Sequence, residues 1–131
     1  MGRGGIDVKP QGVINKPIRA IADGTVVRIA VSPSGFGKAL YINHPNGTTS
    51  VYGHLERFSD SIERYIHEIQ YVRKSFAVDV TPPAGKFVFK QGEQIALSGN
   101  RGSSGGPHLH LEIILDGVRV DPMPSFPQLA A

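Results

Sequence analysis

The sequence of 131 residues contains no cysteine and no tryptophan. Without cysteine, disulfide bonds and thiolate metal sites are excluded, so any metal would be bound by histidine and carboxylate side chains. No apolar run approaches the roughly 20 residues that a membrane-spanning helix needs. The 14 Lys and Arg residues slightly outnumber the 11 acidic ones and are scattered, which permits an anionic partner but does not favour nucleic acid. No signal peptide is visible, and we expect a single domain, residues 1–131, excised from a longer protein.

Short hydrophobic segments separated by turn residues make up most of the chain. Hydrophobic residues account for 40% and charged residues for 19%, which is typical of a folded domain. The 16 Gly and 10 Pro residues favour short strands joined by tight turns over a helical bundle. We predict about seven to nine strands from the β-branched and alternating segments. They lie near residues 6–9, 18–22, 25–31, 38–44, 48–54, 86–90, 94–98, 108–115 and 118–120. With no strand–helix–strand alternation, the predicted fold class is mainly β and antiparallel.

Two local patterns are more specific. Asn46-Gly47 lies between two alternating segments and predicts a β-hairpin. Residues 59–73 carry apolar side chains at helical spacing and predict one amphipathic helix. Asp60 and Glu63 are spaced as a capping pair for the start of that helix.

His108 and His110 are the most suggestive of the five histidines. On a strand, residues two apart share a face and lie about 6.6 Å apart, so one imidazole could bind a metal while the other acts beside it. The alternative is an exposed strand with two incidental histidines. Glu112 follows on the same face, where it would orient an imidazole or face solvent. Asp7, after a glycine-rich segment, is either a metal ligand or a turn residue.

The remaining candidates have a functional and a structural interpretation. His54 follows Gly53 near the end of the second hairpin strand, and is either part of the site or hydrogen-bonded to the backbone. We expect His44 to be a structural residue of the turn and His67 to be a helix residue at or near the surface. Arg3, on these observations alone, is a surface residue.

Six segments occur in the order seen in lysostaphin-type (LytM-like) zinc metallopeptidases, which the chain resembles from about Arg3 to Pro122. They are GIDV at residue 5, ADGTV at 22, YINHPNG at 41, YGHL at 52, SGNRG at 98 and GPHLHLE at 106. The segment from about 57 to 85, which contains the predicted helix, resembles an insertion found in a subgroup of bacterial envelope proteins of this family.

The resemblance implies a small antiparallel β architecture, barrel-sandwich-like, with a groove across the sheet and one inserted helix. It implies action on peptidoglycan peptides in the cell envelope, periplasmic or extracellular, with zinc as cofactor. By the family pattern Asp7 and His110 would be metal ligands. His54 and His108 would be the catalytic residues beside the attacking water and the developing oxyanion.

Arg3 departs from the pattern, because it stands where the family has its first zinc-binding histidine. A guanidinium carries only hydrogen-bond donors and stays charged, so it does not ligate zinc, although it could pair with Asp7. Two hypotheses follow. The domain is either a zinc endopeptidase with an altered metal site, or a non-catalytic relative that binds wall peptide or regulates another wall hydrolase.

Overall fold

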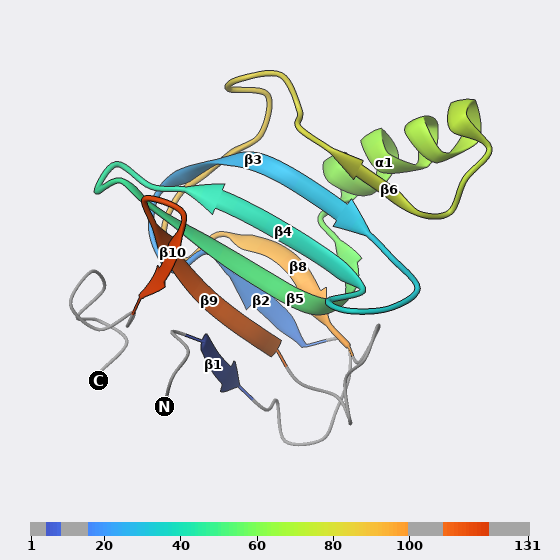
Figure 1. Ribbon diagram of the computed structural model, residues 1–131. Coiled ribbons are helices and arrows are strands. Elements are labelled where there is room, and N and C mark those ends of the chain that lie inside the picture. Colours follow the sequence, from blue (N-terminus) through green and yellow to red (C-terminus); the bar gives the residue numbers. More distant parts are fainter. Residues whose placement is uncertain (1–4, 9–15, 100–108, 121–131) are drawn as a thin grey trace.

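The computed structural model describes residues 5–8, 16–99 and 109–120, with side chains described for 16–99 and 111–120. These ranges contain ten strands and one helix (Figure 1). The strands are β1 (Gly5–Val8), β2 (Pro17–Arg19), β3 (Gly24–Val31), β4 (Lys38–Asn43), β5 (Thr48–Phe58), β6 (Val78–Val80), β7 (Val88–Phe89), β8 (Gln94–Ser98), β9 (Leu109–Leu115) and β10 (Val118–Val120). The helix is α1 (Asp60–Arg73). The predicted mainly β, antiparallel class is confirmed, with one strand more than the upper expectation.

The long strand β5 is the centre of the sheet. One of its edges pairs with β4, which pairs with β3, and β3 pairs with β6 and β7. The other edge pairs first with β9 through Thr48–Gly53 and then with β8 through Leu55–Phe58. Beyond β9 lie β1 and β10, and beyond β8 lies β2. The sheet therefore divides into two branches at His54, and in Figure 1 the branch of β8 and β2 lies behind β5 and β9.

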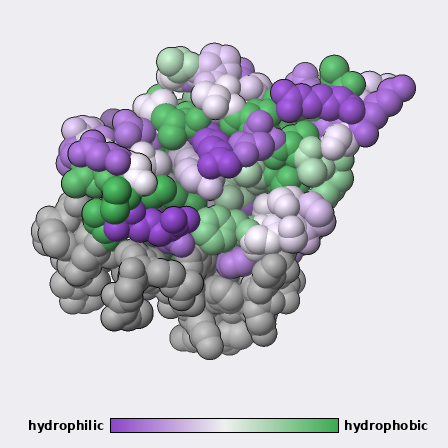
Figure 2. Space-filling model, viewed as in Figure 1, coloured by the Kyte–Doolittle hydropathy of each residue, from purple (hydrophilic) through white to green (hydrophobic). Residues whose placement is uncertain are grey.

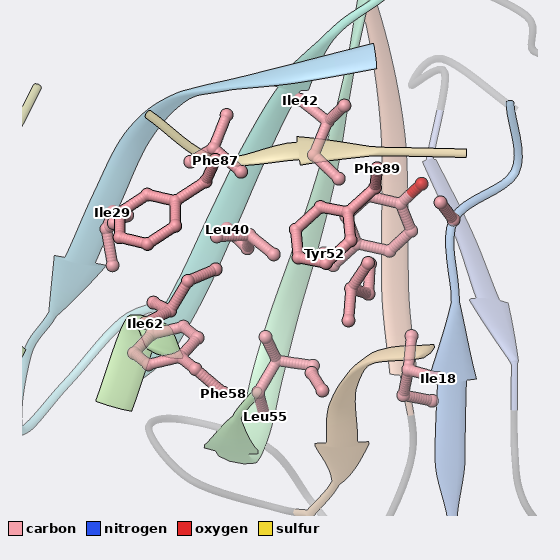
Figure 3. Close-up of a cluster of buried hydrophobic side chains, with 14 of the residues drawn as sticks. Ile18, Ile29, Leu40, Ile42, Tyr52, Leu55, Phe58, Ile62, Phe87 and Phe89 are labelled. Atoms are coloured by element: carbon pink, nitrogen blue, oxygen red, sulfur yellow. The ribbon is translucent and has the colours of Figure 1, made fainter. Parts of the chain in front are cut away.

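The core lies on one face of this curved sheet, which we call the inner face. Leu40 and Ile42 of β4 and Tyr52 of β5 are fully buried there. Figure 3 shows these side chains meeting Phe87, Phe89 and other apolar groups from the surrounding segments. Alternation along β4 places Ala39 and Tyr41 on the opposite face, the outer face. As the hairpin pattern predicts, β4 and β5 are adjacent and antiparallel, with Gly47 at φ 88° in the connection.

Helix α1 packs against the core through all but its last turn. Ile62 and Ile66 are buried and Ile69 is partly buried against the core, whereas Val72 is 78% exposed, so the predicted apolar stripe fails in the last turn. Figure 2 shows mostly hydrophilic surface at the projecting end of the molecule that carries α1. In the described residues, no helix has the length and apolar character needed to cross a membrane.

The predicted capping pair of Asp60 and Glu63 is wrong. The N-cap residue is Ser59, whose side chain makes no capping hydrogen bond, and Asp60 is the first helical residue. Glu63 is buried and turns toward the sheet, where it accepts a hydrogen bond from the Phe58 backbone N–H at 2.8 Å. Hydrogen bonds from buried donors and cations stabilise this carboxylate more than a capping hydrogen bond at the helix start would.

Two strand boundaries also differ from the prediction. β5 continues beyond His54 to Phe58, because β8 supplies a new partner after β9 ends. β6 was not predicted, since its three residues form a strand only through pairing with Ile29, Ala30 and Val31 of β3.

Candidate functional site

Three residues far apart in the sequence occupy one row of the outer face. Asp7 of β1 is the register partner of His110 of β9, and His110 is in turn the partner of Gly53 of β5. Register partners in antiparallel strands share a face and lie about 4.5–5.5 Å apart. Leu111, the neighbour of His110, is buried in the core, so the row of positions 7, 110 and 53 lies on the outer face.

His54 follows this row, at the point where β5 changes partner. Its backbone has φ 58°, a left-handed conformation that is costly for a residue other than glycine, at about 1–3 kcal/mol. The His54 N–H donates to the Phe36 carbonyl at 2.7 Å, and the two rings meet edge to face with centroids 5.8 Å apart. His54 is thus a buried residue held in place by the segment before β4, and not a residue at a strand end.

Phe36 is a site residue that the sequence analysis missed. It comes from the turn between β3 and β4, and its neighbours Gly35 and Gly37 have φ of 64° and 66°. A Cβ atom on Gly53 would lie 3.2 Å from the Phe36 ring, so the absence of a side chain at position 53 makes room for this aromatic group. The signal in the sequence was an aromatic residue between two glycines.

A hollow of about 480 Å³ extends from Phe36 across the outer face. Ala30 of β3 and Ala39 of β4 are register partners and contribute small side chains to its lining. Arg28 and Tyr41 line the same hollow on the next row of these strands. We call this hollow the outer groove. Its Phe36 end adjoins His54 and Gly53, which places the groove beside the row of Asp7 and His110.

Glu112 does not face solvent. Its side chain is buried and forms an ion pair with Arg119 of β10. Glu112 is the register partner of Gly5 and Val51, so it lies on the outer face one row from His110. Its predicted role in orienting an imidazole stays a prediction, and the structure adds Arg119 as its partner.

As expected, His44 is a structural residue and His67 is a helix residue at the surface. His44 Nδ1 lies 2.8 Å from the Asp23 carbonyl oxygen and Nε2 lies 2.7 Å from Ser50 Oγ. Burial holds the pKa of His44 below its usual value. His67 is 63% exposed on α1, and its Nε2 lies 3.2 Å from a Glu63 carboxylate oxygen.

The other predicted site residues lie partly or wholly outside the described residues. Arg3 and His108 lie outside them, and for Asp7 and His110 only the backbone is described. The described part of the chain contains no group of three or more His, Asp or Glu that could hold a metal ion. By the family pattern, Asp7 and His110 would provide two ligands where catalytic zinc takes three protein ligands, and the guanidinium of Arg3 has no lone pair to offer as the third.

The chain is similar in sequence to several known bacterial proteins. It is 37% identical over 107 residues to an uncharacterized metalloprotease of Haemophilus influenzae, covering 82% of this chain and 18% of that protein. It is 33% identical over 120 residues to the DD-carboxypeptidase/endopeptidase Mpg of Neisseria meningitidis, covering 91% and 21%. It is 28% identical over 107 residues to the murein hydrolase activator EnvC of Escherichia coli, covering 82% and 20%. The chain thus spans about a fifth of the length of these relatives.

Solved structures agree with the observed fold. The catalytic domain of lysostaphin from Staphylococcus simulans matches with a TM-score of 0.67 and 25% identity, covering 95% of this chain and 78% of that one. A zinc-containing peptidase from Vibrio cholerae matches with a TM-score of 0.61 and 27% identity, covering 85% and 27%. Residues 2–122 match the family described as Peptidase family M23. This chain therefore belongs to peptidase family M23.

Proposed function

We propose that this domain binds the peptide part of peptidoglycan in the outer groove, at the site of Asp7, His54, His108 and His110. One observation carries the proposal. The register brings Asp7, His110 and Gly53 into one row, beside His54 and the Phe36 end of a hollow of about 480 Å³. The names of the relatives, which include a DD-carboxypeptidase/endopeptidase and a murein hydrolase activator, support a wall peptide as the ligand. A peptidoglycan ligand would place the protein in the cell envelope.

Arg3 favours the first candidate function, which is binding of the peptide without hydrolysis. A cation at the position of the first ligand would repel a metal ion and would instead pair with the carboxylate of Asp7. The similarity to EnvC, which is named as a murein hydrolase activator, is consistent with such a role in regulating another wall hydrolase.

Hydrolysis is the second candidate, and the other four site positions favour it. Asp7, His54, His108 and His110 all carry the residue types that the family pattern requires. Zinc, if bound, would supply an activated water molecule and polarise the peptide carbonyl. The third protein ligand would then have to come from a group other than Arg3.

Metal analysis and a peptide assay on the purified protein separate the two candidates. Binding without hydrolysis predicts no stoichiometric zinc and no cleavage of a glycine-containing wall peptide, together with measurable binding of that peptide. Tightly bound zinc that is lost in Asp7→Ala or His110→Ala would refute it. If the peptide does not bind at all, the proposed function itself fails.

Arg3→His tests whether this one residue accounts for the missing ligand. The substitution should complete the set of Asp7, His110 and a third imidazole, and so create a zinc affinity that calorimetry detects. Arg3→Gln is the matched control, because it removes the same charge without adding a ligand. If both variants bound zinc equally well, the loss of the positive charge, and not the added imidazole ligand, would account for the zinc binding.

A further inference from the structure

The outer groove contains a guanidinium group in a fixed orientation. Arg28 Nε and Nη2 donate to the two carboxylate oxygens of Asp79 at 2.8 and 2.6 Å, which is a bidentate pair. The Arg28 guanidinium carbon also lies 4.6 Å from the centre of the Tyr41 ring. The Arg28 side chain nevertheless stays 45% exposed, so the group is oriented but open to solvent.

The segment after β5, which the resemblance suggests is an insertion, supplies part of this arrangement. Asp79 belongs to β6, which pairs with β3 along Ile29, Ala30 and Val31. Ala77, Val78 and Asp79 line the same hollow as Phe36 and Arg28, so this segment supplies one wall of the groove. In Figure 1, α1 and β6 lie together at one side of the sheet, next to β3. Without β6, Arg28 would have no Asp79 to hold it.

Strand geometry gives the approximate distance between the backbone positions of Arg28 and Gly53. Arg28 is the partner of Tyr41, and Tyr41 is the partner of Val51, which precedes Gly53 by two residues. Two strand spacings of about 4.8 Å and a shift of about 6.6 Å along the strand amount to about 12 Å. An extended peptide covers this distance with three or four residues.

Resting on the proposed function, the geometry points to Arg28 as the specificity-determining residue of the outer groove, which binds a carboxylate of the peptide three or four residues from His54. Of the five N–H donors of a guanidinium, Asp79 engages two, and the Nη1 edge has no protein partner among the described residues. A guanidinium already held by Asp79 and Tyr41 loses little conformational entropy when a ligand binds. Charge-assisted hydrogen bonds are the stronger class, so a carboxylate is favoured over an amide.

Matched peptides that differ only at the C-terminus test this assignment. The probes are pentaglycine and a peptidoglycan stem pentapeptide, each with a free carboxylate and as the amide, titrated by NMR into the wild-type domain. The peptide with the free carboxylate should bind about tenfold more tightly than its amide. This factor corresponds to the lower end of the range of contributions from a hydrogen bond to a charged group. Diglycine and its amide are too short to reach from His54 to Arg28 and should not differ.

Arg28→Gln should remove this preference while leaving the melting temperature nearly unchanged. Arg57→Gln is the control, because Arg57 is also 45% exposed and paired with an aspartate, Asp60, but does not line the groove. It should keep the preference. Equal binding of acid and amide by the wild type, or a preference that survives in Arg28→Gln, overturns the assignment. Failure of every peptide to bind the wild type would instead overturn the proposed function on which it rests.

Discussion

Replacing Glu63 with alanine should destabilise the domain strongly. The Glu63 side chain is 5% exposed, and its Oε2 atom lies 3.3 Å from Lys38 Nζ, whose side chain is 13% exposed. The same carboxylate accepts the Phe58 N–H at 2.8 Å. Removing one partner of a buried ion pair costs about 3–5 kcal/mol, since the other charge stays buried without compensation. The partial exposure of Lys38 sets the expected loss at the lower end, about 3 kcal/mol.

Urea unfolding measures this loss. With a slope of about 1–3 kcal/mol per molar, a loss of about 3 kcal/mol lowers the midpoint by about 1–3 M. The matched control is the double variant Lys38→Met with Glu63→Gln. It removes both charges and keeps an amide oxygen that can accept from Phe58, so it should recover to within about 1 kcal/mol of the wild type. A Glu63→Ala protein within about 0.5 kcal/mol of the wild type would refute the reasoning, because it would mean that solvent already screens the pair.

Two further predictions concern the site and the core. Gly53→Ala places a Cβ atom 3.2 Å from the Phe36 ring, so Phe36 must shift. We expect the free energy of unfolding, measured with urea, to fall by about 1 kcal/mol and peptide binding to weaken. Unchanged peptide binding would show that Phe36 does not shape the groove. Because the folded-state pKa of His44 is lowered, the unfolded state binds more protons below about pH 6.5, and stability should fall as the pH drops below that value. His44→Gln should flatten this part of the stability–pH curve measured by urea unfolding, and a curve that keeps its slope would assign the effect to other groups.

The sequence by itself was sufficient where the deciding interactions are local. The Asn46-Gly47 turn, the apolar spacing of Ile62 and Ile66, and the alternation of Leu40 and Ile42 depend on residues close together in the chain. These patterns follow from the periods of the helix and the strand, and the structure confirms them. The ordered motifs likewise predicted the family.

Tertiary structure decided the features that depend on distant partners. The pairing of Asp7 with His110 follows from the register of β1 on β9, and β6 exists only because β3 offers it an edge. Glu63 left its expected capping position because Lys38 and the Phe58 N–H, which belong to the sheet, bind its carboxylate more strongly than the helix start does. Such outcomes depend on which distant groups folding brings together, and a local period carries no information about that choice.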